Sequence, residues 1–169
     1  MLLPLLFAIV LAQAQPASTP VPNPKPDLSQ LMYFAGTWTC HQKLRGSDRP
    51  DTSTATMVLN DRWLQVHDVA PPFDRYRTYP IDTDSYYTYD PVMKRFVNVN
   101  IDDAAGYSLA STPGWSGNNL VWTDRSALDG SITVTAITRV NDSEYNWRAT
   151  GTDGKGKPVP AQSGNCKKS

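Results

Sequence analysis

From Gly36 onward, polar and apolar residues alternate with a period of two in short runs along the chain. The runs are rich in Thr, Val, Ile, Tyr and Trp, and turn-forming residues interrupt them about every ten positions. A period of two places successive side chains on opposite faces of a β-strand, so that one face of each run is available for a core. The pattern therefore predicts an all-β chain of short strands.

We expect nine strands in these positions: Thr37–Leu44, Ser53–Leu59, Trp63–Val69, Ser85–Tyr89, Phe96–Ile101, Tyr107–Ser111, Leu120–Asp124, Ile132–Val140 and Tyr145–Thr150. Tight-turn signals lie between them at Asn60-Asp61, Asp90-Pro91, Gly117-Asn118, Asp129-Gly130 and Asn141-Asp142. Strands joined by such turns are antiparallel neighbours, which predicts an up-and-down meander. With no second helical segment to cover its edges, the meander is expected to close into a barrel of about eight to ten strands.

A short helix is expected before the first strand. Asp27 is a suitable helix cap, Leu28, Leu31 and Met32 follow at helical spacing, and Gly36 ends the segment. We expect this helix to plug one end of the barrel. An immunoglobulin-like sandwich is the alternative architecture, but its cysteines usually lie on the second and sixth strands, whereas the two cysteines here bracket the whole domain.

The first 26 residues contain no candidate core. Residues 1–14 are interpreted as a signal peptide, because the apolar run from Leu2 to Leu11 ends in Ala12-Gln13-Ala14, the small-x-small pattern at which signal peptidase cleaves. A membrane anchor is the alternative, but a spanning helix needs about twenty apolar residues. Residues 15–26 are interpreted as a Pro-rich linker, and 27–169 as the barrel domain. The expected location is therefore secreted or periplasmic, with no membrane span in the mature chain.

Two cysteines, Cys40 and Cys166, are present, and an oxidising compartment favours one disulfide between them. Two ligands of a metal site are the alternative, but the chain has no further Cys, and its two histidines, His41 and His67, do not have the spacing of a metal site. The 16 basic and 16 acidic residues cancel, which argues against nucleic acid and anionic membranes as partners. No catalytic, cofactor-binding or metal-binding motif is found, so a catalytic role is uncertain and less expected than binding.

Gly36-Thr37-Trp38 follows the expected helix and opens the first strand. Further motifs follow in order: Trp63-Leu64, Tyr89-Asp90-Pro91, Lys94-Arg95-Phe96, Trp115-Ser116-Gly117, Leu120-Val121-Trp122 and Cys166-Lys167-Lys168. In this order they resemble a bacterial family of exported proteins, a domain of unknown function in the calycin, or lipocalin-like, superfamily.

The resemblance implies a lipocalin-like barrel in which Gly36 and Trp38 have structural roles. It also implies a basic residue from a late strand stacked on Trp38, for which Arg139 and Arg148 are the candidates. Some calycin relatives bind haem through a His near the C-terminus, but no His follows His67 here. No cofactor is therefore expected.

Two expectations concern which side chains face the barrel interior. Trp38 and Cys40 share a face, so an inward Trp38 requires an inward Cys40, unless a bulge or an inward fold of the tail separates them. Asn98, Asn100 and Asp102 form a polar row, which we expect on the solvent side.

Six residues are the candidates for a ligand-binding cavity, because small-molecule pockets are mostly apolar with a few polar groups: Trp63, His67, Tyr87, Tyr89, Trp122 and Trp147. The leading hypothesis is a non-enzymatic protein that binds a small apolar or amphipathic molecule. The alternative is a filled barrel that serves as a structural or protein-interaction module, with the Pro71–Pro80 loop as the contact surface, since Phe, Tyr and Arg dominate interface energetics.

Overall fold

The computed structural model describes residues 24–44, 47–72 and 78–169. A short 3-10 helix, η1 (Ser29–Phe34), precedes the strands, and the predicted signal peptide lies outside the described residues. The eleven strands are β1 (Gly36–Leu44), β2 (Ser47–Val58), β3 (Trp63–Ala70), β4 (Ile81–Asp90), β5 (Arg95–Asp102), β6 (Tyr107–Thr112), β7 (Trp115–Ser116), β8 (Asn119–Ser126), β9 (Ile132–Asn141), β10 (Glu144–Thr152) and β11 (Pro158–Lys168).

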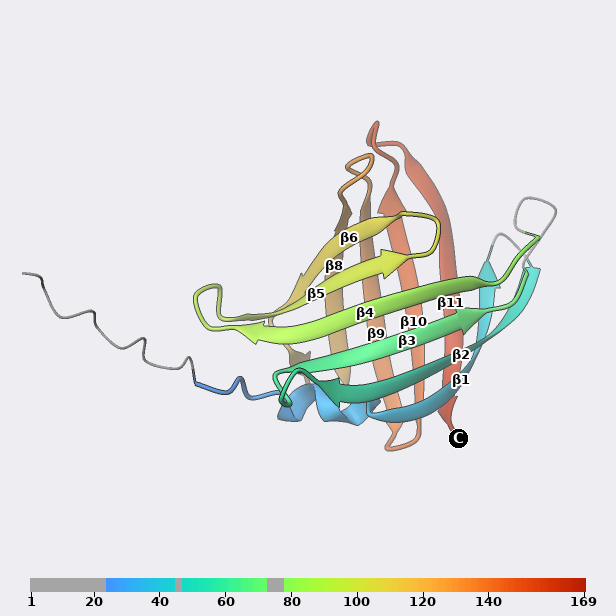
Figure 1. The fold of residues 1–169 in the computed structure, drawn as a ribbon. Helices are drawn as coiled ribbons and strands as arrows, with labels where there is room; N and C mark the ends of the chain where they lie inside the picture. Colours follow the sequence, from blue (N-terminus) through green and yellow to red (C-terminus); the bar gives the residue numbers. More distant parts are fainter. Residues whose placement is uncertain (1–23, 45–46, 73–77) are drawn as a thin grey trace, which may run out of the picture.

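The strands form one closed antiparallel barrel, with η1 across one end (Figure 1). Neighbouring strands pair in the order β6-β5-β4-β3-β2-β1-β11-β10-β9-β8, and β6 pairs with β8 to close the ring of ten. β7 also pairs with β8, and it continues the edge of β6 after an interruption at Pro113 and Gly114. The predicted all-β antiparallel barrel with a short N-terminal helix is confirmed.

The strand that closes the barrel at the chain's end, β11, was not among the nine predicted. It pairs with β1 on one side and with β10 on the other, so the last strand of the chain lies beside the first (Figure 1). The sequence of β11 does not indicate a strand. Proline and glycine are uncommon in strands, and this segment contains Pro158, Pro160 and Gly164; its N-terminal half is also exposed.

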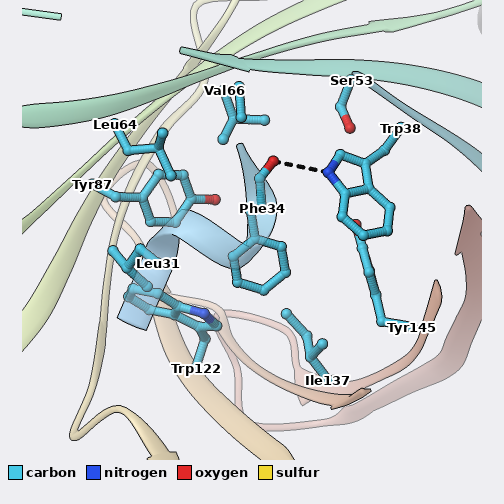
Figure 2. A pocket seen from close by; sticks show the side chains of 11 residues that line it. Leu31, Phe34, Trp38, Ser53, Leu64, Val66, Tyr87, Trp122, Ile137 and Tyr145 are labelled. Carbon is cyan, nitrogen blue, oxygen red and sulfur yellow. Dashed lines mark hydrogen bonds between the residues drawn. The ribbon is translucent and has the colours of Figure 1, made fainter. Parts of the chain in front are cut away.

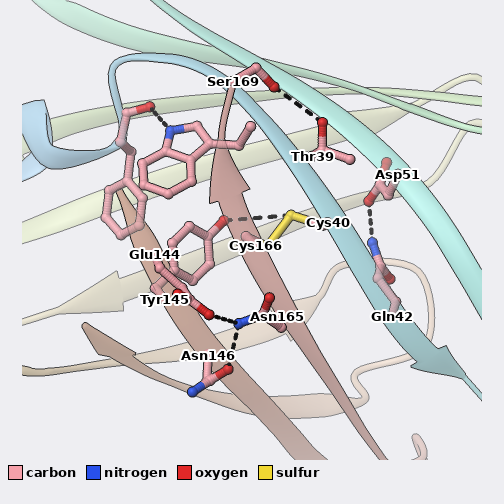
Figure 3. Close-up of a disulfide and its surroundings, with 12 residues drawn as sticks. Thr39, Cys40, Gln42, Asp51, Glu144, Tyr145, Asn146, Asn165, Cys166 and Ser169 are labelled. Atoms are coloured by element: carbon pink, nitrogen blue, oxygen red, sulfur yellow. Dashed lines mark hydrogen bonds between the residues drawn. A yellow bond between two sulfur atoms is a disulfide. The ribbon is translucent and has the colours of Figure 1, made fainter. Parts of the chain in front are cut away.

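The disulfide Cys40–Cys166 joins β1 to β11 inside the barrel, as predicted (Figure 3). The two residues are direct partners in the strand register, with their Cα atoms 4.0 Å apart. The pairing of β1 with β2 and with β11 runs without a register shift, so no bulge separates Trp38 from Cys40 and both point inward. The C-terminal segment forms strand β11 of the barrel wall, and its Cys166 lies opposite Cys40 inside the barrel.

Trp38 is 2% exposed, and its Nε1 donates a hydrogen bond of 2.8 Å to the Phe34 carbonyl oxygen. The rings of Tyr33 and Tyr145 contact it at centroid distances of 5.4 and 4.9 Å. Of the three residues expected on the buried face of the helix, Leu28 and Leu31 are buried in the apolar cluster beside Trp38, whereas Met32 is 42% exposed. The helix is of the 3-10 type, so the face that it buries repeats every three residues rather than every three or four.

A basic residue does lie over Trp38, but it is neither of the two predicted. The Nζ atom of Lys168, at the end of β11, is 5.4 Å from the Trp38 ring centroid. Arg139 instead lies over the rings of Tyr33 and Trp115, at 4.1 and 4.4 Å from their centroids. Arg148 is exposed on β10.

The barrel interior has an apolar half next to η1 and a polar half at the other end. Leu31, Leu64, Phe96 and Leu120 belong to the apolar cluster. The polar row that begins at Asn98 was expected on the solvent side, and this was wrong: Asn98 is 5% exposed and shares the inner face of β5 with Phe96. The outer face of β5 carries the apolar residues instead. Polar side chains usually face solvent, but in the half of the barrel away from η1 polar side chains face the interior.

Candidate functional site

A cavity of about 100 Å³ lies inside the barrel directly above η1. Side chains from the helix and from seven strands surround it (Figure 2): Leu31, Phe34, Trp38, Ser53, Ala55, Leu64, Val66, Tyr87, Trp122, Ile137 and Tyr145. Figure 2 shows Phe34 projecting from η1 among the strand residues. The wall is mainly apolar and aromatic, which is typical of sites for small molecules.

The cavity exists because small and large residues alternate across neighbouring strands. The inward positions of β2 carry Ser53 and Ala55, while their neighbours on β1 and β3 include Trp38 and Leu64. Two small side chains leave a space that the rings around them do not fill.

Three hydroxyl groups face this apolar space. In the described part of the chain, Ser53 makes no side-chain hydrogen bond, although the residue is only 9% exposed. Burial raises the pKa of Tyr87 to about 12, while a hydrogen bond with Ser85 opposes the shift. Burial also raises the pKa of Tyr145, whose hydroxyl lies 3.9 Å from Cys40 Sγ (Figure 3). Both phenols are therefore neutral donors at physiological pH.

Two carboxyl groups, Asp51 and Asp68, lie beside these hydroxyls. Asp68 is the direct register partner of Ser53, and Asp51 accepts a hydrogen bond from Gln42 Nε2. Burial, together with the hydrogen bond and negative charge of Asp51, raises the pKa of Asp68 to about 8, and the Arg49 guanidinium opposes this shift. At neutral pH the Asp68 carboxyl is therefore mainly protonated.

A second hollow, of about 370 Å³, lies toward the far end and has a different character. Its lining is mainly polar, with hydroxyls of Ser108, Ser126 and Thr135 near Asp124. Ser108 Oγ donates a 2.9 Å hydrogen bond to Asp124, and burial raises the pKa of that carboxyl. This lining favours water over an apolar molecule.

The structure brings two of the six candidate ligand-binding residues, Tyr87 and Trp122, to the cavity, with their ring centroids 5.3 Å apart. Tyr89 packs on the apolar cluster, and Trp147 packs beside the disulfide. Trp63 and His67 occupy the face of β3 opposite to Leu64 and Val66, outside the barrel.

His67 is half exposed there, and its Nδ1 lies 3.1 Å from Asp84 Oδ1.

Nine of the eleven cavity-lining residues were not among the six candidates: Leu31, Phe34, Trp38, Ser53, Ala55, Leu64, Val66, Ile137 and Tyr145. Trp38 and Leu31 were assigned structural roles only. Tyr145 could have been found from the period of two, because it is the partner of Cys166 and shares the inward face of β10.

Among the described residues, no group of three or more His, Cys, Asp and Glu side chains is arranged to hold a metal ion. Within the same residues, no helix has the length and apolar character to cross a membrane. The Pro71–Pro80 loop, named as a protein-interaction surface, lies outside the described residues at positions 73–77.

No protein-family model matches the chain, and no curated protein matches its sequence. Among solved structures, the chain is similar to EF1p2_mFAP2b bound to DFHBI, with a TM-score of 0.40 and 9% identity. That similarity covers 83% of this chain and 97% of the other.

Proposed function

We propose that the chain is a non-enzymatic binding protein that holds one small apolar or amphipathic molecule in the cavity above η1. The observation that carries this proposal is an interior space of about 100 Å³ with an apolar and aromatic wall. Burial of apolar surface in such a space drives binding, and the hydroxyls of Ser53, Tyr87 and Tyr145 supply a few polar contacts that orient the ligand.

The size of the cavity restricts the ligand. Pockets for drug-sized molecules occupy about 300–1,000 Å³, whereas an apolar cavity of about 150 Å³ holds benzene. A space of about 100 Å³ therefore limits the ligand to a short alkyl chain or, at most, a single ring, and excludes a fatty acid, a retinoid or a porphyrin. For so few ligand atoms we expect a Kd of about 0.1–1 mM, or about −4 to −6 kcal/mol.

We also infer that the protein works outside the cytoplasm, in the periplasm or secreted, as a divergent relative of the exported calycin family named above. The pattern of Leu2–Leu11 followed by Ala12-Gln13-Ala14 supports this, as does the Cys40–Cys166 disulfide, since such bonds persist in oxidising compartments. Intact-mass measurement on the exported protein is expected to show loss of residues 1–14 and of two hydrogens. Retention of Met1 would contradict export by this route.

The binding proposal is tested by titrating the full protein with toluene, benzyl alcohol and butanol while tryptophan emission is recorded. Trp38 and Trp122 are in the cavity wall, so an occupant changes their emission saturably. Ala55→Leu places a larger side chain in the cavity and is expected to abolish the saturable change. Thr54→Leu is the matched control, because Thr54 is the exposed neighbour on the same strand and its side chain points outward.

Two results would reject the binding proposal: no saturable response to any of the three probes, or equal responses from Ala55→Leu and the parent. In either case the filled-barrel module becomes the better description. Ala55→Leu would then overpack the interior and lower the free energy of unfolding by about 1–3 kcal/mol, whereas it would fill an empty space if the proposal holds.

A further inference from the structure

Three inward side chains form a row across the barrel wall and end at an acid. Trp38 on β1 is the register partner of Ser53 on β2, and Ser53 is the partner of Asp68 on β3. Directly opposed residues in antiparallel strands have Cβ atoms about 4.5–5.5 Å apart. Trp38 and Ser53 line the cavity, and the strand register places Asp68 next to Ser53, just beyond the lining residues and so at the margin of the cavity.

One acceptor atom of each carboxyl group at this margin lacks a donor in the described residues. One oxygen of Asp51 and one of Asp68, Oδ1 in each, is buried without a hydrogen-bond partner in the described residues, and Asp51 is 5% exposed. Ser53, also nine-tenths buried, lines the cavity and has no side-chain partner in the same residues. A buried polar atom without a partner costs about 1–3 kcal/mol, and more when charged. The margin therefore favours an occupant that donates hydrogen bonds.

Asp68 is faced by one acidic and one basic side chain and by two neutral phenols. Asp51 and Arg49 face it from β2, and the neutral phenols of Tyr87 and Tyr145 come from β4 and β10. When Asp68 releases its proton, the two carboxyl groups face one guanidinium in the described part of the chain, and one more positive charge would balance them. Aromatic faces of Trp38, Tyr87 and Tyr145 surround the adjacent space, and such faces attract cations.

We propose that the occupant of the cavity is an organic cation: a primary amine on a single ring or short alkyl chain, with its ammonium group against Asp68. This assignment rests on the proposed binding function and names its ligand class. The apolar body fills the space between Phe34 and Trp122, and the ammonium donates to Asp68 and Ser53. A carboxylate ligand is disfavoured, because its charge would face Asp51 and Asp68.

The proposal carries a pH dependence with a definite sign. With its pKa raised to about 8, Asp68 holds a proton in the empty protein at neutral pH. An ammonium group favours the ionised carboxylate, so amine binding must release that proton. The amine's affinity is therefore expected to rise by up to about tenfold per pH unit from pH 6 to pH 8, and to level off above it.

The test is calorimetric titration of the full protein with benzylamine, benzyl alcohol and benzoate, which carry the same ring with a cationic, neutral or anionic substituent. At pH 8 we expect benzylamine to bind at least about tenfold more tightly than benzyl alcohol, with no detectable binding of benzoate. Titrations at pH 7 in two buffers of different ionisation enthalpy are expected to show release of close to one proton per benzylamine bound.

Asp68→Asn removes the charge and keeps the shape of the side chain. It is expected to bring benzylamine to within about twofold of benzyl alcohol and to abolish proton release. Asp84→Asn is the matched control, because it removes the same charge from the outer face of the neighbouring strand β4 and leaves the preference unchanged. Benzyl alcohol binding by Asp68→Asn shows that the variant is folded.

The outcomes separate the two proposals. Benzyl alcohol binding without a preference for benzylamine overturns the cation assignment and leaves the binding function intact. A preference that survives in Asp68→Asn overturns the role of Asp68. Saturable binding by none of the three compounds rejects the binding function itself, and the cation assignment with it.

Discussion

Removal of the Cys40–Cys166 disulfide is expected to be the most costly change that leaves the surface of the barrel intact. The double variant Cys40→Ala, Cys166→Ala frees the first strand from the last, which the bond joins across a sequence separation of 126 residues. In the chain-entropy model the lost constraint is 2.1 + 1.5R ln n cal/mol/K, which for this loop amounts to about 5 kcal/mol at 25 °C. Single domains are stable by about 5–15 kcal/mol, so the variant is left with a fraction of the parent's stability.

The assay is guanidinium unfolding followed by tryptophan emission, with the free energy of unfolding obtained by linear extrapolation. The control is Thr39→Ala, Lys167→Ala, which alters the adjacent outward-facing pair on the same two strands and is expected to change stability by less than about 1 kcal/mol. A loss below about 1 kcal/mol in the cysteine variant, at an unchanged slope, would refute the argument that the bond acts by restraining the unfolded chain.

Two further predictions concern single side chains. Trp38→Ala is expected to lower the free energy of unfolding by about 3–5 kcal/mol, because it removes a buried ring and the hydrogen bond to Phe34; a loss under about 1 kcal/mol in denaturant melts would contradict this packing. Asp68 has a pKa of about 8 in the folded protein against 3.8 for the free side chain, so unfolding releases a proton between these values and stability falls as the pH rises from about 4 to 8. The stability of Asp68→Asn is expected to lack this pH dependence and to exceed that of the parent above pH 8. Denaturant melts of both proteins at pH 5 and pH 8.5 test this. If the difference in unfolding free energy between variant and parent is the same at both pH values, the prediction is contradicted.

The parts of the fold that the sequence predicts are those in which local pattern and tertiary environment agree. Leu64 and Val66 alternate with polar residues and are flanked by turn signals, so β3 was placed to within one residue. The nine expected strands all correspond to observed ones, although several extend further, as β4 does from Ser85 back to Ile81.

Where local pattern and environment disagree, prediction from the sequence failed for a physical reason. β11 is held by its two neighbours and by Cys166, and these contacts override residues such as Pro160 that disfavour strands. Asn98 lies inside because its neighbours on β5 fix the register, and polarity alone does not reveal this. The cavity was harder to predict, because it forms where the small side chains of Ser53 and Ala55 fail to fill the interior, and no sequence motif marks such a position.

The pairing of β1 with β11 also affects the order in which this protein can be made. A ribosome releases β1 through β10 before the residues that seal the wall, so the nascent chain has an open edge at β1 until Lys168 has emerged. Such pairing between the ends of a chain carries the largest loop-closure entropy, and it forms late in folding. Closure of the barrel and formation of its disulfide therefore follow the synthesis of β11.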